Sequence, residues 1–387
     1  MLRTAIGALL LFVVVDLAGQ APPPVERYHQ AIPSSKAELS PAEDGLVDSI
    51  HAAFDDAGRS RPEADPNLHL ACRALCEVLD CSDVDGISAW EPQTIQFTLR
   101  RFGVTDGFYF PVVARVESAA DARRVLAKVI SRDVVPQGMN RFGVALDVDE
   151  RHLLVAVFTR RLAQLGPFAR EAMPGDTVLL WGGLLDGAGN PRLLLATPEG
   201  ALFEQPLKES QGLFWAQVFF PEEAGEYVVE ILVDRDGPQV ASLFPVYVGI
   251  EAPQRPVFKV LPGVEEEAST SNLERQVLSL INREREKRGY PTCRWSSELA
   301  DDCRRYSREM ASEGRLSHAL DRSEGDYTEN ISLSTSLHAA HANLMGSPSH
   351  RRNILDREAI SCGVGIVAVS RGEGVRLLYI TQRFSRK

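Results

Sequence analysis

The sequence predicts a multidomain α+β protein in which two regions of mixed helices and strands flank one all-β region. Residues 163–250 contain short β-rich runs separated by turn signals such as Asp186-Gly187-Ala188-Gly189-Asn190, a spacing typical of a β-sandwich. Residues 43–162 and 272–387 pass through helix and strand patterns in the same order, which indicates an internal repeat. A chain of 387 residues has room for two to three domains.

The first 42 residues are expected to lie outside these domains. Ala5–Val15 is an apolar run preceded by Arg3, too short to span a bilayer, and it predicts a signal peptide over residues 1–21. An uncleaved anchor is the alternative. Both interpretations place the chain outside the cytoplasm, either secreted or in the periplasm or cell envelope. The proline-rich stretch 22–42 is expected to be a tether without regular structure.

Composition restricts the class of partner. The chain is 44% hydrophobic and 25% charged, as globular proteins are, and its formal net charge is −11. No basic stripe occurs in the sequence, so we expect no nucleic-acid partner and no membrane contact beyond the signal peptide.

The repeat is defined by segments that match in order. The segment Leu68–Arg73 aligns with Leu299–Arg304, and Phe142–Leu146 aligns with Cys362–Ile366. We interpret residues 43–162 as a diverged, degenerate copy of the C-terminal fold. The alternative is that helices and strands of unrelated α/β domains resemble one another by chance.

The β-rich region 163–250 has one further signature. Ala224-Gly225-Glu226-Tyr227 before a strand resembles the tyrosine turn of immunoglobulin-like modules, so we expect an immunoglobulin-like sandwich. Trp181 and Trp215 are expected in its core rather than at a sugar-binding surface. Residues 251–271 are expected to be a linker to the C-terminal domain.

The segment His338–Leu355, HAAHANLMGSPSHRRNIL, predicts two helices with a break between them. Apolar residues recur at helical spacing up to Met345, and Pro348 biases the residue before it away from the helical region. Ser349 is expected to be the N-cap of a short turn over His350–Leu355. His350 is therefore predicted to be held at a helix–turn junction, which suits a site residue.

This segment resembles the histidine motif of bacterial SCP-like domains, which belong to the CAP superfamily of cysteine-rich secretory proteins, antigen 5 and pathogenesis-related proteins. Further matching pieces occur in the family's order: Leu280–Arg285 with Gly289, Trp295–Ala300, Ser317-His318, Glu329-Asn330-Ile331, Gly363–Gly365 and Tyr379–Phe384. The resemblance covers residues 272–387 and implies an α-β-α sandwich there.

The resemblance also implies a cleft lined by His318, Glu329 and His350. Some members of the family bind a divalent metal through the two histidines, so zinc at His318 and His350 is a possible cofactor. Neutral imidazoles are good zinc ligands, and a carboxylate orients an imidazole through its other ring nitrogen. The second glutamate of animal and plant members would fall near Ser347 and is absent. In the first copy, Val112-Val113-Ala114 stands where the C-terminal copy has Glu329-Asn330-Ile331, so the polar site is lost there.

Two classes of function follow. We expect a secreted, non-enzymatic binding module, with no catalytic residue, whose ligand or partner is a small apolar molecule, an extracellular protein or a cell-envelope component. The alternative is a metal-dependent hydrolase acting on peptide or cell-envelope substrates, although neither HExxH nor GxSxG occurs. A third interpretation is that the three residues only form a buried hydrogen-bond network that joins strand to helix.

Six cysteines in an exported chain favour disulfides. We expect two bridges, Cys76–Cys81 and Cys293–Cys362, with Cys72 and Cys303 as buried thiols on matching helix positions. A bridge between Cys72 and Cys303 that joins the two copies is the alternative.

Overall fold

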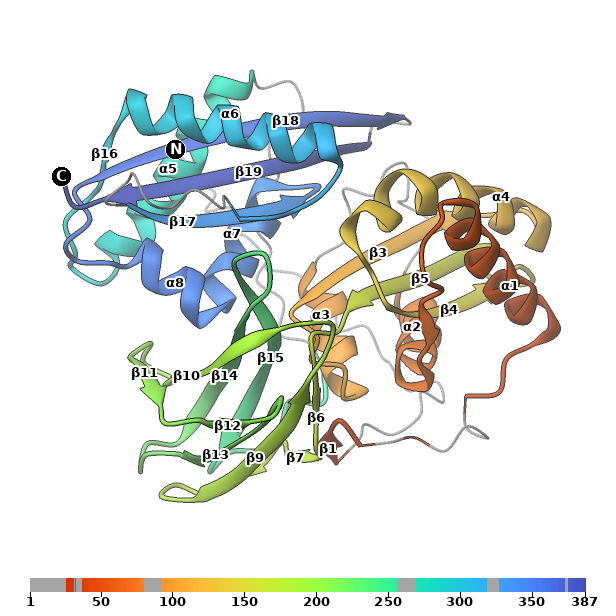
Figure 1. Ribbon diagram of the computed structural model, residues 1–387, viewed down its shortest axis with the longest axis horizontal. Coiled ribbons are helices and arrows are strands. Elements are labelled where there is room, and N and C mark those ends of the chain that lie inside the picture. The colour runs from red at the N-terminus through yellow and green to blue at the C-terminus, as the bar shows by residue number, and fades with distance from the viewer. Residues whose placement is uncertain are drawn as a thin grey trace, which may run out of the picture.

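The computed structural model describes residues 26–30, 32, 37–79, 92–255, 269–318, 327–372 and 375–387. The predicted signal peptide lies outside these residues. Figure 1 shows three domains, with the N-terminal domain (red to gold) and the C-terminal domain (cyan to blue) both in contact with the green β-sandwich. Within the described residues, every helix is too short or too polar to cross a bilayer.

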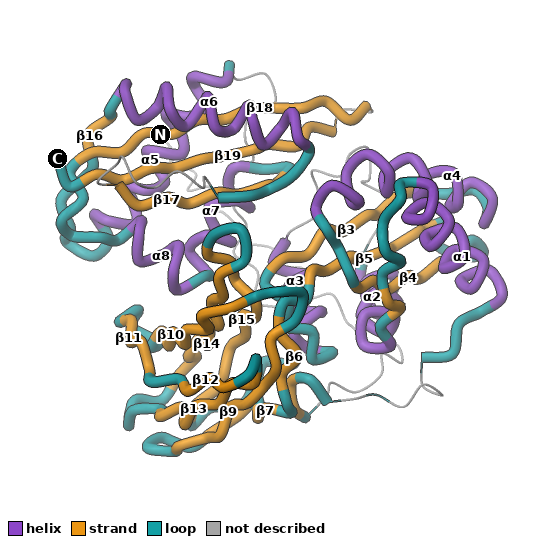
Figure 2. The backbone as a smooth tube through the Cα atoms, viewed as in Figure 1, coloured by secondary structure: helices purple, strands orange, loops and turns teal. Residues whose placement is uncertain are grey.

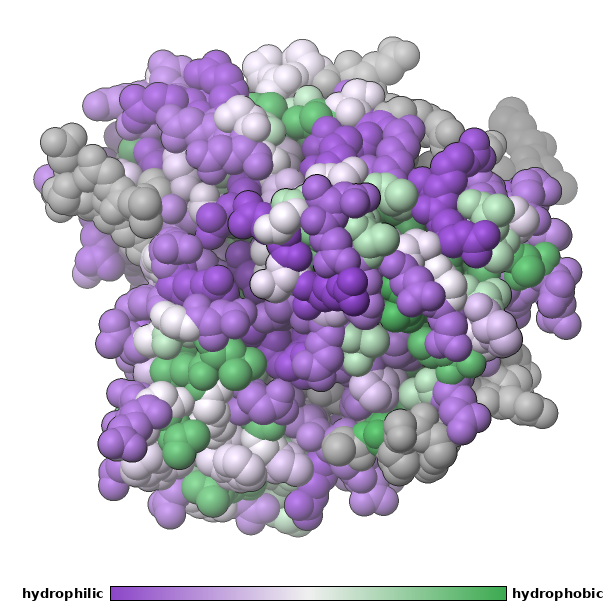
Figure 3. Space-filling model, turned by 45° about the vertical axis from the view of Figure 1, so that its right-hand side comes forward, coloured by the Kyte–Doolittle hydropathy of each residue, from purple (hydrophilic) through white to green (hydrophobic). Residues whose placement is uncertain are grey.

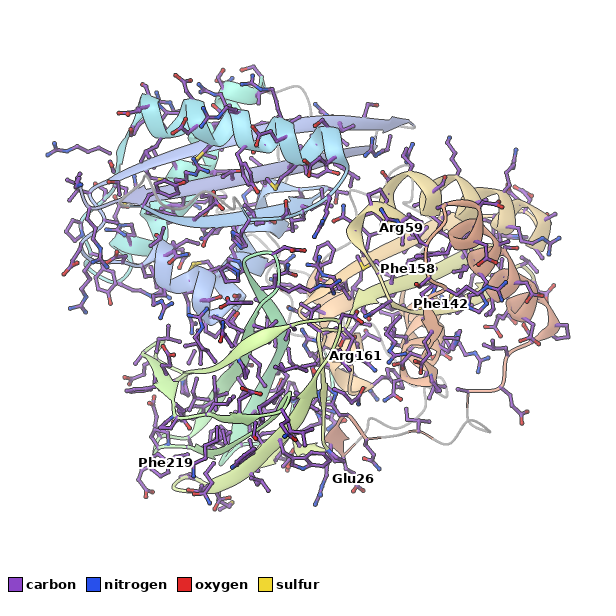
Figure 4. The ribbon with its side chains drawn as sticks, viewed as in Figure 1. Glu26, Arg59, Phe142, Phe158, Arg161 and Phe219 are labelled. Atoms are coloured by element: carbon purple, nitrogen blue, oxygen red, sulfur yellow. The ribbon has the colours of Figure 1, made fainter. Side chains whose placement is uncertain are left out.

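The N-terminal domain is a four-stranded sheet with helices on both faces, and its strand order is β2-β4-β5-β3. One face packs apolar side chains against α2 and α3, and the other packs them against α1 and α4. Phe142 and Phe158 stack within the second core, 6.1 Å between ring centroids (Figure 4). Its elements are α1 (Pro41–Asp56), β2 (Glu63–Ala64), α2 (Pro66–Val78), α3 (Pro92–Arg101), β3 (Phe108–Arg115), α4 (Ala119–Val129), a π-helical turn (Ile130–Val134), a 3₁₀ turn (Val135–Gln137), β4 (Arg141–Asp147) and β5 (Leu153–Arg160).

The C-terminal domain has a second four-stranded sheet, in the order β16-β18-β19-β17. Helix α6 lies along one face of this sheet (Figure 2), while α5 and α7 cover the main apolar core on the other. The α-β-α arrangement predicted for this region is therefore present. Its elements are α5 (Thr270–Glu286), β16 (Arg294–Trp295), α6 (Ser297–Glu313), β17 (Tyr327–Ser334), α7 (Leu337–Gly346), α8 (Pro348–Ile354), β18 (Ser361–Gly372) and β19 (Val375–Ser385).

The two α/β domains share topology. In each sheet a two-residue strand pairs parallel with the next strand, β2 with β4 and β16 with β18, and the remaining pairs are antiparallel. In each domain, a glycine allows a strand of the sheet to contact a helix backbone directly. A Cβ on Gly143 would lie 2.3 Å from the Leu68 carbonyl carbon, and one on Gly363 would lie 2.4 Å from the Ala300 nitrogen. Only glycine permits this close approach.

An ion pair also recurs. Arg73 on α2 binds Glu43 on α1 at 2.9 Å, and Arg304 on α6 binds Glu274 on α5 at 2.6 Å. The partners are 30 residues apart in both cases. The acidic partner is buried in each pair, so each arginine compensates a carboxylate that has been removed from water.

Strand register locates the position in the N-terminal sheet that corresponds to Glu329 in the C-terminal sheet. In the C-terminal sheet, Gly363 lies opposite Arg383 and Arg383 lies opposite Glu329. The buried carboxylate of the predicted site therefore sits directly across from an arginine on the neighbouring strand.

In the N-terminal sheet, Gly143 lies opposite Val157 and Val157 lies opposite Pro111. Pro111 is thus the position equivalent to Glu329. The prediction that Val112 holds this position is wrong by one residue. Proline on an edge strand gives up only a backbone donor that faces away from the sheet.

Residues 163–248 form two packed sheets, with strand orders β11-β10-β14-β15-β8 and β12-β13-β9-β6. They enclose one apolar core. The Tyr227 hydroxyl donates to the carbonyl of Glu223 at 2.9 Å, as the predicted tyrosine turn requires. The strands are β6 (Ala163–Leu165), β7 (Phe168–Ala169), β8 (Glu171–Ala172), β9 (Thr177–Leu184), β10 (Gly189–Ala196), β11 (Leu202–Gln205), β12 (Lys208–Ser210), β13 (Leu213–Phe219), β14 (Gly225–Asp234) and β15 (Pro238–Val248).

The prediction that Trp181 and Trp215 lie in the sandwich core is wrong. The two residues pair across β9 and β13, and they are 51% and 40% exposed. Their neighbours Leu180 and Phe214 point inward instead, because side chains alternate along a strand. Figure 3 shows hydrophobic residues at the surface in the lower part of the molecule, where the sandwich lies.

Part of the predicted tether is structured. β1 (Arg27–Tyr28) pairs with β7, and the Tyr28 ring is fully buried in the sandwich core. Its hydroxyl donates to the carbonyl of Pro245 at 2.7 Å. A large aromatic residue with a satisfied hydroxyl anchors this stretch despite the surrounding prolines.

Buried polar contacts hold the N-terminal domain on the sandwich. Arg161, near the end of the N-terminal domain at the junction in Figure 4, binds Asp106 and Asp65 of the same domain, each at 3.0 Å. The amide of Leu243 on β15 donates to the carbonyl of Thr105 at 2.8 Å. The N-terminal and C-terminal domains meet through the ion pair between Asp133 and Arg371, which is 2.8 Å long.

The cysteine predictions had mixed outcomes. Cys72 and Cys303 are fully buried thiols, as predicted. The predicted Cys293–Cys362 bridge is not formed, since both are separate buried thiols whose sulfurs lie near the carbonyls of Ala359 and Gly363. The Cys76–Cys81 pair cannot be placed, because Cys81 lies outside the described residues.

Candidate functional site

A cavity of about 1000 Å³ opens where the three domains meet. Strand β3 of the N-terminal domain and strand β17 of the C-terminal domain, each an edge strand of its sheet, contribute most of their length to its walls. The start of β15 contributes the third wall. His318, Glu329 and His350 all line this cavity, so the structure brings the three predicted site residues together.

Glu329 holds a fixed place in the site. One carboxylate oxygen lies 3.1 Å from His318 Nδ1, and the other accepts from the Arg383 guanidinium at 2.9 Å. Burial alone would raise the pKa of Glu329, but His318 and Arg383 together hold that pKa below its ordinary value. Arg383 also lies over the Tyr327 ring, 4.5 Å from its centroid. Glu329 is therefore an ionised carboxylate with both oxygens engaged.

His350 is placed by the two predicted helices. Helix α7 ends at Gly346 and α8 begins at Pro348, the residue type that suits the first turn of a helix. The N-cap is Ser347 rather than the predicted Ser349. Ser347 makes no side-chain capping bond, because its hydroxyl is used elsewhere.

A carboxylate from the sandwich also enters the site, and sequence reasoning missed it. The Ser347 hydroxyl donates to Glu230 on β14, and the Ser349 amide donates to the other oxygen of Glu230 at 2.7 Å. Glu230 is fully buried, which raises its pKa although the two serines lower it. A lone glutamate within the apolar strand Tyr227–Val233 is the only sequence signal that could have pointed to it.

These contacts determine the tautomer of each histidine. Ser347 gives its only proton to Glu230, so His350 Nδ1, 2.7 Å from the same hydroxyl oxygen, must donate to it. His318 Nδ1 likewise donates to the ionised Glu329. Burial lowers the pKa of His350 to about 3, so this ring is neutral at physiological pH. His350, and His318 when neutral, therefore keep a lone pair on Nε2.

Asparagines join the helix to the strand. Asn330 Nδ2 donates to the His350 carbonyl at 3.1 Å, and Asn353 Nδ2 donates to Asn330 Oδ1 at 2.9 Å. A hydrogen-bond network therefore joins β17 to α8, but it is not the network of His318, Glu329 and His350 that the third interpretation proposed. It is built on Asn330 and Asn353, while the ring nitrogens of His318 and His350 are held by other groups.

The donor set matches a zinc site only in part. Two Nε2 lone pairs, each on a ring oriented through its Nδ1, are the form that zinc ligands take. A closed site needs four ligands and a catalytic one needs three from the protein. Among the described residues, no group of three His, Cys, Asp or Glu side chains is arranged to hold a metal. Arg383 already occupies the nearest carboxylate, so these residues do not fit a complete zinc site.

Comparison with known proteins agrees with the fold of the C-terminal domain. The model of the cysteine-rich secretory protein family, CAP, matches residues 278–384. No curated protein matches the chain.

Three solved structures with some likeness to this chain come from bacteria, and their superposition on the whole chain is weak. An extracellular protein containing an SCP domain from Bacillus anthracis is 16% identical, covering 56% of this chain and 68% of that one, with a TM-score of 0.27. A cysteine-rich secretory protein from Staphylococcus aureus is 15% identical, covering 54% and 76%, with a TM-score of 0.26. An outer surface protein from Borrelia burgdorferi is 13% identical, covering 31% and 97%, with a TM-score of 0.27.

The family match falls on the sheet and helices that carry His318, Glu329 and His350. Residues 278–384 are therefore a CAP domain, the domain of the cysteine-rich secretory protein family.

Proposed function

We propose that this chain is an exported protein that binds a small ligand non-covalently in the cavity between its three domains. The cavity carries the proposal, since about 1000 Å³ is the size of pocket that encloses a drug-sized ligand. Its walls are mostly apolar, with Phe108, Val240 and Leu333 as examples from the three domains. The Nε2 atoms of His318 and His350 provide the acceptors that would orient a hydroxyl or amine of the ligand.

We further propose that residues 43–162 are a diverged CAP-like copy whose role is to form a wall of the cavity. The shared strand order, the matched glycines and the recurring ion pair support common descent. Pro111 and Val157 stand where the C-terminal copy has Glu329 and Arg383, so the copy lacks this carboxylate–guanidinium pair. The immunoglobulin-like sandwich would then position both copies, and its Glu230 would fix α8.

The alternative, a metal-dependent hydrolase, would need a metal with an open coordination position. Glu329 is poorly placed to act as a general base, because Arg383 and His318 hold both of its oxygens. Binding therefore explains the arrangement better than hydrolysis does. Zinc titration of metal-free protein separates the two. The binding proposal expects no stoichiometric zinc site, and a tight one-to-one complex lost in H318Q and H350Q would support the hydrolase.

The direct test uses Nile red, an uncharged apolar dye that fluoresces when it leaves water. Wild-type protein should bind it saturably, and Leu333→Trp, which fills the cavity from β17, should reduce that binding at least tenfold. Leu213→Trp on the exposed face of the sandwich is the matched control, since Leu213 is 61% exposed and lies outside the cavity. Equal dye binding by L333W and wild type would show that the cavity is not the binding site.

A further inference from the structure

The cavity is cationic although the chain as a whole is acidic. The formal net charge is −11, yet eight arginines and lysines and only three carboxylates are among the described residues lining the cavity. The three acids are already neutralised within the protein: Asp121 by Arg124, Asp133 by Arg132 and Arg371, and Glu329 by Arg383. Five cations of the lining have no ion pair with any described residue: Arg115, Lys128, Arg160, Arg192 and Arg352.

Arg160 is the most enclosed of these five. It ends β5, its guanidinium lies 5.3 Å from the centroid of the Phe108 ring, and its Nη1 reaches the Gln137 carbonyl only at 3.4 Å. Its Nε is buried without a hydrogen-bond partner. Burial, together with the charges of Arg315 and Arg235, lowers the pKa of Arg160 to about 10. The guanidinium nevertheless stays charged at neutral pH, and a buried charge without a counterion is costly.

The described acid whose charge acts on Arg160 is Asp236, and this acid is already in use. Asp236, in the turn between β14 and β15, binds Arg315 at 3.1 Å. The neighbouring Gly237 lies against His318, because a Cβ on it would be 3.4 Å from the His318 Cβ. Arg160 and His318 therefore both lie beside this turn, and the charge of Arg160, which no described residue pairs, faces the cavity between the three domains.

From this arrangement we infer that the ligand is an anionic amphiphile, an apolar body carrying a carboxylate or phosphate group, and that Arg160 binds its anionic group. This inference rests on the proposed function and specifies the ligand class for the same cavity. Leu232, Val240, Ile331 and Leu333 provide apolar surface for the body. Guanidinium binds carboxylate or phosphate through two parallel hydrogen bonds, which makes Arg160 a determinant of specificity. A CAP domain alone would lack this group, since Arg160 belongs to the N-terminal domain.

The test compares ligands that share one apolar body, each below the concentration at which it forms micelles. Dodecanoate and dodecyl phosphate carry the anion, dodecanol is neutral, dodecyltrimethylammonium is cationic, and inorganic phosphate is the anionic group alone. Titration calorimetry on the full chain should show that dodecanoate or dodecyl phosphate binds at least tenfold more tightly than dodecanol. The cationic ligand and inorganic phosphate should bind more weakly than dodecanol. The preference between dodecanoate and dodecyl phosphate then distinguishes the carboxylate from the phosphate.

Arg160→Gln should weaken binding of the preferred anion at least tenfold and change dodecanol affinity less than twofold. Arg59→Gln removes the same charge from an exposed site on the N-terminal domain (Figure 4) and should change neither. Arg160→Lys should restore part of the preference for the anion. The ligand-free R160Q protein should melt at the same temperature as wild type or higher, because an uncompensated charge has been removed, whereas a purely structural role predicts a lower temperature.

The two proposals fail differently. Equal affinities for dodecanoate, dodecyl phosphate and dodecanol, or R160Q affinities equal to those of wild type, would overturn the role of Arg160 while leaving a ligand-binding cavity in place. Nile red binding that L333W does not reduce would instead remove the cavity proposal itself.

Discussion

Glu230 Oε2 lies 2.7 Å from the amide nitrogen of Ser349, although the two residues belong to different domains and are 119 positions apart. The other Glu230 oxygen accepts the Ser347 hydroxyl, which in turn accepts from His350. The sandwich thus positions a histidine of the CAP domain. This contact occurs near Ser347, where the sequence comparison found the family's second glutamate to be missing.

Removing Glu230 should destabilise the protein. In Glu230→Ala the Ser347 hydroxyl and the Ser349 amide lose their buried acceptor, which costs about 1–3 kcal/mol per unsatisfied group. We expect the free energy of unfolding to fall by about 2 kcal/mol or more in urea denaturation. Glu204→Ala, at an exposed glutamate on β11, is the control and should change it by less than about 0.5 kcal/mol. Equal effects would mean that Glu230 does not hold α8.

His350 should make stability depend on pH. Its pKa is about 3 in the folded protein, against about 6.5 in an unfolded chain, so below pH 6.5 the unfolded state takes up a proton that the folded state does not. Stability is therefore lost as pH falls from 7 to 5, by about 1–2 kcal/mol for this residue. Asn at position 350 cannot be protonated, so H350N should show a shallower loss over the same range.

Other buried histidines contribute to the same pH dependence. The pKa of His29 is about 3 and that of His341 about 4, both lowered by burial. The informative quantity is therefore the difference in slope between wild type and H350N. Parallel curves for the two proteins would contradict a neutral, enclosed His350.

The Glu329–Arg383 pair should behave as a buried ion pair. Both side chains are almost inaccessible to solvent, being 2% and 5% exposed. Removal of one partner leaves an uncompensated charge, so Glu329→Leu or Arg383→Met should each lower the free energy of unfolding by about 3–5 kcal/mol.

The double variant E329L/R383M should recover much of the stability that either single variant loses, because no buried charge remains in this pair. A double-mutant cycle measured by urea denaturation gives this coupling. Additive losses in the double variant would show that the two side chains act independently.

The shared topology predicts matched behaviour of two glycines. Gly143→Ala and Gly363→Ala would each place a methyl group within about 2.4 Å of a helix backbone, so each should cost about 3 kcal/mol. Gly346→Ala, which has open space around its Cβ position, should be nearly neutral. Thermal unfolding of the three variants measures this. A tolerated alanine at position 143 would remove one of the observations that support common descent of the two domains.

Much of the C-terminal domain could be predicted because its signals are local. The apolar spacing of Ala339–Met345 and the stop before Pro348 predicted α7 and the break after it correctly, although α8 begins at Pro348 rather than at His350. The motif containing Glu329 was expected at a cleft, and Glu329 lines the cavity between the domains. Local patterns of this kind do not depend on where other domains lie.

The wrong and missing predictions concern features that depend on tertiary structure rather than on local sequence. In Val178–Trp181 both strand faces are apolar, so alternation could not show that Trp181 points outward and Leu180 inward. The contact of Glu230 with α8 joins two domains, and sequence spacing contains no information about it. The same holds for Arg160, because the lack of an ion pair between Arg160 and any described residue depends on how the three domains meet.

The central claim is that one cavity, formed by all three domains, binds the ligand. Three variants test it together by filling the cavity from each wall in turn: Ala114→Trp on β3, Val240→Trp on β15 and Leu333→Trp on β17. The measurement is the affinity for Nile red, in proteins whose melting temperatures show that they remain folded. We predict that each single substitution reduces affinity at least tenfold. Wild-type affinity in a folded A114W or V240W protein would contradict a single cavity shared by the three domains.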